Sequence, residues 1–202
     1  MSGVSLANQI YFILSLLYFG LTSGACVLTA QYWGKKDTRT IEKVMGMSFR
    51  ISILAGIVFA AVAFFFPYQL MRIFTADEAV IAAGVSYLKI VAFSYVLSAF
   101  TNVYLNIIRS IEQVVIATVV YGTSLAANIV LNAIFIFGLF GAPAMGAAGA
   151  ALGTLCSRAV EVVIVVFYAV KINHVVKIRF KDWFVKDKAL AKDFFTYAFR
   201  YS

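Results

Sequence analysis

The chain has 202 residues, of which 63% are hydrophobic and only 13% are charged, and its formal net charge is +8. A soluble domain holds roughly 45–50% apolar and about 25% charged residues, so this composition excludes an ordinary soluble domain. Two Pro, two Cys and 13 Gly also exclude a collagen-like or disulfide-stapled chain. An integral membrane protein remains. The positive charge does not indicate nucleic-acid binding, because the basic residues must first be placed relative to a bilayer.

Charged residues divide the chain into apolar stretches, each about as long as the 20 residues that a membrane-spanning helix needs. Residues 113–157 carry no charge, which is too long for one span, and Gly138, Gly141, Pro143 and Gly146 break this stretch near its middle. The stretches are continuously apolar, whereas the strands of membrane barrels alternate. The sequence therefore predicts an all-α polytopic bundle with transmembrane helices at about residues 6–32, 43–68, 79–108, 114–139 and 147–170.

Lysine and arginine predict the orientation, because they favour cytoplasmic loops. The loops after the first and third predicted helices, together with the tail from residue 171 onward, hold 13 of the 17 basic residues, whereas the opposite loops hold only Arg72. We expect a multi-pass protein of the plasma (inner) membrane with a cytoplasmic C-terminal tail. Five spans then place the N-terminus outside, and residues 1–9 show no signal pattern. We therefore expect that a helix upstream of Met1 is missing from this chain.

The tail at residues 172–202 combines basic residues with an apolar face. Leu190, Phe194 and Ala198 share that face, because they are spaced four residues apart. A basic amphipathic segment of this kind typically lies in the headgroup layer of a membrane. A frayed chain end is the alternative interpretation.

The most specific sequence block runs from Asn128 to Arg158 and reads NIVLNAIFIFGLFGAPAMGAAGAALGTLCSR. It resembles the fifth helix, outer turn and sixth helix of the multidrug and toxic compound extrusion (MATE) transporters. Residues 24–34 are similar to the end of that family's second helix, residues 87–90 to the start of its fourth, and residues 109–110 to the loop after it. The resemblance runs from about residue 8 to residue 171, and its parts fall in the family's order.

The resemblance implies a twelve-helix exporter built from two six-helix lobes. Residues 1–171 would form helices two to six of the first lobe, and residues 172–202 would connect it to the missing C-terminal lobe, so this chain would be inactive alone. The implied function is antiport of small organic cations against Na⁺ or H⁺, with the lipid bilayer as surroundings and no cofactor. Lipid-linked polysaccharide or lipid-precursor flippases share the superfamily's fold and are the alternative function.

Polar residues inside the spans are candidate site residues, because polar groups are costly in a bilayer. Asn128 and Asn132 share one helix face, and their amide oxygens suit Na⁺ or a hydrogen bond to a carboxylate. In related transporters an Asn and an Asp at these positions line a cation site, so Asn132 removes a titratable group. Thr154 adds a hydroxyl. The alternatives are helix–helix amide bonds worth about 0.6–2 kcal/mol and, for Thr154, a bond to its own helix.

Four further residues are candidates for the interior surface of the bundle. Arg158 and Glu161 lie in the last predicted span, where neither can face lipid at low cost. Their i, i+3 spacing predicts a local ion pair, and the alternative is a gate or a contact with the missing lobe. Asn102 and Asn106 share a face of the third predicted helix and are candidate cavity-lining residues.

Enzymatic function is not expected. Cys26 and Cys156 lack the paired spacing of a metal or redox site, His174 is the only histidine and lies in the tail, and no predicted span contains an aspartate. These features disfavour a metal-dependent or redox enzyme and an intramembrane protease. The one candidate metal is Na⁺, at Asn128 and Asn132.

Overall fold

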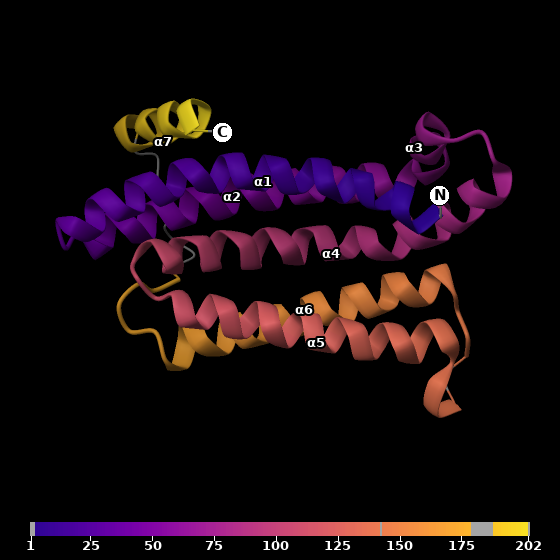
Figure 1. The fold of residues 1–202 in the computed structure, drawn as a ribbon. Helices are drawn as coiled ribbons and strands as arrows, with labels where there is room; N and C mark the ends of the chain where they lie inside the picture. Colours follow the sequence, from indigo (N-terminus) through magenta and orange to yellow (C-terminus); the bar gives the residue numbers. More distant parts are fainter. Residues whose placement is uncertain (1–2, 142, 179–187, 202) are drawn as a thin grey trace. The chain divides into compact units, whose positions relative to one another are not determined.

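The computed structural model describes residues 3–141, 143–178 and 188–201, and their regular structure is helical (Figure 1). Five helices are long and apolar enough to cross a membrane. They are α1 (Gly3–Gly34), α2 (Thr38–Phe65), α4 (Glu78–Ser110), α5 (Val114–Phe137) and α6 (Ala147–Lys171). Two shorter helices, α3 (Pro67–Phe74) and α7 (Lys188–Tyr201), and a 3₁₀ turn at Leu139–Gly141 complete the described elements. The predicted all-α polytopic bundle with five transmembrane helices is confirmed.

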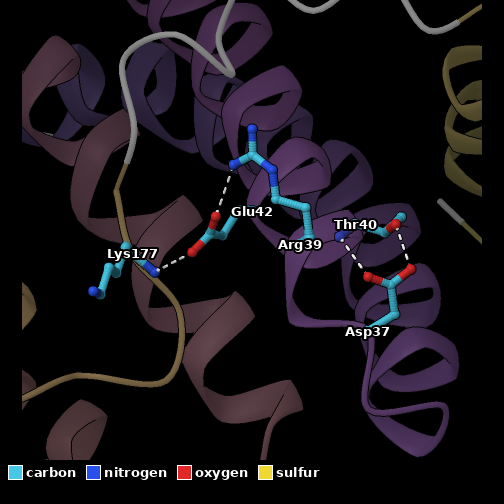
Figure 2. A network of polar contacts seen from close by, with 5 residues as sticks. All are labelled: Asp37, Arg39, Thr40, Glu42 and Lys177. Carbon is cyan, nitrogen blue, oxygen red and sulfur yellow. Dashed lines mark hydrogen bonds and ion pairs between the residues drawn. The ribbon is translucent and has the colours of Figure 1, made fainter.

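The ends of α2 differ from the predicted span of residues 43–68, for two local reasons. Pro67 lacks an N–H and its fixed φ suits the first turn of a helix. It therefore begins the separate helix α3, which the predicted spans did not include, and α2 ends at Phe65. At the other end, α2 begins at Thr38 because Asp37 caps it, as Figure 2 shows.

The Asp37 carboxylate accepts two hydrogen bonds from Thr40 at the start of α2. The Thr40 backbone N–H donates to Oδ1 at 3.0 Å, and the Thr40 hydroxyl donates to Oδ2 at 2.6 Å. The hydroxyl, and then the backbone N–H, lower the pKa of Asp37 from its ordinary value, because both stabilise the ionised form. An ionised carboxylate at this position also interacts favourably with the helix dipole.

Glycine conformation explains where the long uncharged stretch turns. Gly138, Gly141 and Gly146 have φ values of 72°, 84° and 53°. These values lie in the left-handed region, which costs glycine little because it has no Cβ. α5 therefore ends at Phe137 and α6 begins at Ala147, close to the predicted boundary.

The chain forms two compact units, and the division between them falls inside the long helices. The first unit comprises residues 1–14, 55–98 and 121–161, and the second comprises residues 15–54, 99–120 and 162–202. Fourteen of the 17 lysine and arginine residues belong to the second unit and three to the first. Basic charge is therefore concentrated in one unit.

Close helix approaches hold the first unit together. A Cβ at Gly84 of α4 would overlap the side chain of Met71, so the missing side chain leaves room for the fully buried Met71 of α3. A Cβ at Gly149 of α6 would overlap the carbonyl group of Phe135 in α5. Small residues allow such backbone approach between membrane helices, and Gly149 therefore serves the packing of α6 against α5.

The second unit has its own apolar core, to which α7 contributes. Leu190 and Phe194 of α7 pack with residues of α1 and α2, and this core comprises Ala25, Leu28, Val44, Met47, Leu190 and Phe194. A Cβ at Gly24 would overlap the backbone nitrogen of Ala198, so α7 approaches α1 closely at this point. The apolar face predicted for the headgroup layer is therefore buried against protein, because α1 and α2 offer it a complementary surface. Residues 179–187 of the predicted connector lie outside the described residues.

Polar contacts fasten the chain after α6 to the second unit. Glu42 of α2 is buried and accepts hydrogen bonds from Arg39 Nη1 at 2.9 Å and from the backbone N–H of Lys177 at 3.0 Å (Figure 2). Asn173 donates to the Tyr104 hydroxyl at 3.0 Å and accepts from the backbone N–H of Val175. These contacts join segments of distant sequence position within one unit.

Large apolar side chains remain exposed along the long helices. Phe19, Phe65, Val115 and Phe137 each expose more than two thirds of their surface. Water would disfavour so much exposed apolar surface, whereas lipid tails accept it. The exposed surface therefore supports a membrane setting.

Candidate functional site

A cavity of about 430 Å³ lies in the first unit, and helices α1, α4, α5 and α6 line it. Most of its lining side chains are polar or aromatic: Asn8, Tyr11, Tyr87, Tyr121, Leu125, Asn128, Thr154, Ser157, Arg158 and Glu161. We call it the polar cavity. A smaller pocket of about 30 Å³ shares five of these residues and adds Val91 and Ser94. The sequence candidates Asn128, Thr154, Arg158 and Glu161 thus meet in one place.

Arg158 and Glu161 form the ion pair that their spacing predicts. Nη1 of Arg158 lies 2.7 Å from Oε1 and 2.9 Å from Oε2 of Glu161. The Glu161 side chain is 1% exposed and that of Arg158 is 25% exposed. The Arg158 guanidinium also lies 5.8 Å from the centroid of the Tyr11 ring, within the range of a cation–π interaction. The two opposite charges neutralise each other within the wall of the polar cavity.

The two asparagines of α5 are hydrogen-bonded to each other. Asn132 Nδ2 donates to Asn128 Oδ1 at 3.0 Å, as their i, i+4 spacing allows. Asn128 lines the polar cavity, whereas Asn132 faces Gly153 of α6, where a Cβ would overlap its Oδ1. Among the described residues this buried Oδ1 has no hydrogen-bond partner. Asn132 therefore holds the Asn128 side chain by a hydrogen bond and packs against α6 at Gly153.

Thr154 lines both pockets and bonds to its own helix. Its hydroxyl donates to the carbonyl oxygen of Ala150 at 2.9 Å, which is the local bond expected for a threonine in a helix. Its oxygen can still accept a hydrogen bond from a group in the cavity, because a hydroxyl is both donor and acceptor.

The sequence did not predict the α1 and α4 residues of the cavity wall, nor Tyr121, Leu125 and Ser157. The Tyr87 hydroxyl donates to Asn8 Oδ1 at 2.9 Å, and Tyr11 stacks on Tyr95 with ring centroids 5.8 Å apart. A signal existed, because Asn8 and Tyr11 are spaced i, i+3 and so share one face of a predominantly apolar helix. The many tyrosines of the chain hid this signal, since most aromatic residues of a membrane protein face lipid.

Asn102 and Asn106 belong to the second unit and do not line the polar cavity. Asn106 Nδ2 donates to the backbone oxygen of Asn102 at 2.9 Å, and the backbone oxygen of Asn106 accepts from the Ser110 hydroxyl at 3.0 Å. Local helix bonding thus uses the Asn106 amide. A cavity-lining role for these two residues stays a prediction.

Comparison with known protein families shows which family this chain belongs to. The family model described as MatE matches residues 1–134, about two thirds of the chain. The chain belongs to the MatE family. This result confirms the resemblance to MATE transporters that the sequence shows, and it makes the chain a multi-pass membrane protein of a transporter family.

Curated relatives carry names from multidrug resistance. The chain is 25% identical over 173 residues to "Probable multidrug resistance protein YoeA" of Bacillus subtilis, covering 86% of this chain and 37% of that protein. It is 29% identical over 161 residues to "Probable multidrug resistance protein NorM" of Thermotoga maritima, covering 78% and 34% respectively. The chain thus spans little more than a third of the length of these MatE relatives.

Solved structures agree with the fold. A multidrug resistance MATE family transporter of the MOP superfamily, in an inward-facing conformation, matches with a TM-score of 0.85 at 23% identity, covering 98% of this chain and 44% of that one. A MOP superfamily transporter from Pyrococcus furiosus, described as having reverse polarity of its binding pocket, matches with a TM-score of 0.76 at 23% identity, covering 96% and 43%. At these identities the likeness establishes the fold alone.

Proposed function

We propose that this MatE-family chain forms part of the transport path of a secondary active multidrug exporter, which moves small organic cations against Na⁺ or H⁺. The observation that carries the proposal is the polar cavity, in which three tyrosines and a buried carboxylate line about 430 Å³ inside membrane-spanning helices. Small-molecule sites typically measure about 300–1,000 Å³. The names of the multidrug resistance relatives support the same function.

Each wall of the polar cavity has a proposed role. The faces of Tyr11, Tyr87 and Tyr121 attract an organic cation through cation–π interaction. The oxygens of Asn128 and Thr154 accept hydrogen bonds from the ligand or bind Na⁺, with Asn132 orienting Asn128. The ion pair of Arg158 and Glu161 forms the gate of the polar cavity. The protein acts as a transporter rather than an enzyme, as members of its family do, and it needs no cofactor.

A lipid-precursor flippase is the second function to test. One observation favours it, since Arg158 places a cation in the cavity wall that could bind a phosphate. Glu161 already pairs with Arg158, however, so the pair adds no net positive charge to the cavity. We therefore prefer organic cations as the substrate class.

The test places this chain in a complete transporter. Residues 1–171 replace the matching segment of NorM from Thermotoga maritima, and ethidium efflux is measured in cells that lack their own efflux pumps. We expect the chimera to export ethidium under a Na⁺ or H⁺ gradient. A chimera that reaches the membrane in normal amount, yet moves a lipid-linked glycan and no ethidium, would establish the flippase function instead.

In that chimera, Asn128→Ala is expected to slow efflux about tenfold at unchanged membrane abundance. The variant removes one hydrogen-bond acceptor for a charged ligand, worth about 1.5 kcal/mol or more. Ser86→Ala is the matched control, because Ser86 is exposed on α4, bonds to the Ala82 carbonyl of its own helix and does not line the cavity. If Asn128→Ala lowers abundance but leaves efflux per molecule intact, Asn128 serves only helix packing.

We also propose that the protein lies in the plasma (inner) membrane with residues 172–202 as a cytoplasmic connector to a further lobe. The excess of basic residues in the second unit supports this orientation. In a chain whose two cysteines are replaced by serine, an impermeant thiol reagent should label Asp77→Cys in intact cells. It should label Lys36→Cys only after permeabilisation. Labelling of Lys36→Cys in intact cells would reverse the orientation.

A further inference from the structure

Arg158 already contacts the two groups of the polar cavity that would recognise a cationic ligand. Its guanidinium lies 5.8 Å from the centroid of Tyr11 and 2.7 Å from a carboxylate oxygen of Glu161. An aromatic face and a carboxylate are the two groups that attract an organic cation most strongly in proteins. In this structure both are already engaged by a cation of the same chain.

The charge and burial of Glu161 prevent the Arg158 guanidinium and a cationic ligand from pairing with its carboxylate at the same time. Glu161 is 1% exposed, and the positive charge of Arg158 balances its negative charge, so the ion pair has no net charge. A ligand that arrives while the pair is intact gains little from the carboxylate. Arg158 is 25% exposed and borders the larger cavity, and its long side chain has many rotamers. The guanidinium therefore has both the reach and the space to leave Glu161.

We propose that Arg158 is an internal competitor of the transported cation and determines its specificity. The ligand displaces the guanidinium from Glu161 and Tyr11 and takes over both contacts. This inference rests on the proposed function and refines its substrate class. A small hydrated cation cannot offset the loss of the Arg158–Glu161 pair. A bulky aromatic monocation with delocalised charge can, because it also buries apolar surface against the tyrosine rings and Leu125.

The test is a set of four charge states of the same cavity. Tetraphenylphosphonium binding to the purified full chain is measured by titration calorimetry at one fixed pH for all variants. Arg158→Gln leaves a net negative charge and should tighten binding about tenfold. Glu161→Gln leaves a net positive charge and should weaken binding at least tenfold. The double variant is again neutral and should bind within about threefold of the unchanged chain.

A merely structural ion pair would give a different pattern, with weaker binding in both single variants. Arg72→Gln is the matched control, because Arg72 of α3 lies 6.0 Å from the Tyr68 ring and does not line the polar cavity. This control should bind like the unchanged chain. Triphenylphosphine oxide, a neutral probe of similar shape, should show no tightening with Arg158→Gln.

The outcomes separate the inference from the proposed function. If no form of the chain binds tetraphenylphosphonium, the proposed function fails together with the inference. If the unchanged chain binds it and Arg158→Gln does not tighten binding, only the inference fails. If Arg158→Gln is not monodisperse, NMR of the unchanged chain labelled with ¹⁵N-arginine replaces this comparison. The Nε–H signal of Arg158 is identified as the one that is absent from the spectrum of Arg158→Lys. It must shift when tetraphenylphosphonium is added, and an unshifted signal at saturation would overturn the proposed competition.

Discussion

Gly149→Leu is expected to destabilise the first unit by about 3 kcal/mol or more. A Cβ at Gly149 would lie 2.6 Å from the carbonyl carbon of Phe135. A side chain could rotate away, but this neighbour is backbone of α5, so the two helices must separate. Overpacking of a well-packed contact typically costs about 1–3 kcal/mol, and leucine adds three further carbons. The expected fall in the thermal unfolding midpoint is about 6–12 °C.

Gly122→Ala is the matched control for this prediction. Gly122 also lies in α5, and a Cβ there would meet no atom within 4 Å. Alanine should leave the midpoint unchanged or raise it, because glycine inside a helix costs about 0.5–1 kcal/mol relative to alanine. A Gly149→Leu chain with the midpoint of the unchanged chain would show that α5 and α6 do not approach as described.

Gly24→Leu is expected to detach α7 from the second unit. A Cβ at Gly24 would lie 2.7 Å from the Cα of Ala198, so a leucine cannot fit while α7 is docked. Release of α7 exposes Leu190 and Phe194, which are buried in the unchanged chain. Limited trypsin digestion should then cut after Lys192 at least ten times faster, with the membrane helices still intact by mass.

Gly34→Leu tests whether the effect is specific to the docking contact. Gly34 ends the same helix, and a Cβ there would meet no atom within 4 Å. Digestion at Lys192 should proceed at its ordinary rate in this control. Equal rates in Gly24→Leu and Gly34→Leu would mean that α7 does not dock on α1 through this glycine.

The sequence by itself determined the structural features that depend on a single helix. The five spans follow from apolar runs between charges, because an unpaired charge in lipid is costly. The Asn132–Asn128 hydrogen bond and the Arg158–Glu161 ion pair follow from spacings of four and three residues, which place two side chains on one helix face. The family resemblance rests on such local patterns as well.

Only the tertiary structure decided which faces meet. Nothing in the local spacing indicates that Tyr87 of α4 bonds to Asn8 of α1, or that Ala198 of α7 rests on Gly24. Such contacts depend on the volumes of all side chains between two helices, and a helix of mostly apolar residues presents no single obvious packing face. For the same reason the sequence predicted Asn128 and Arg158 as separate candidates, and the fold placed them in one cavity with three tyrosines.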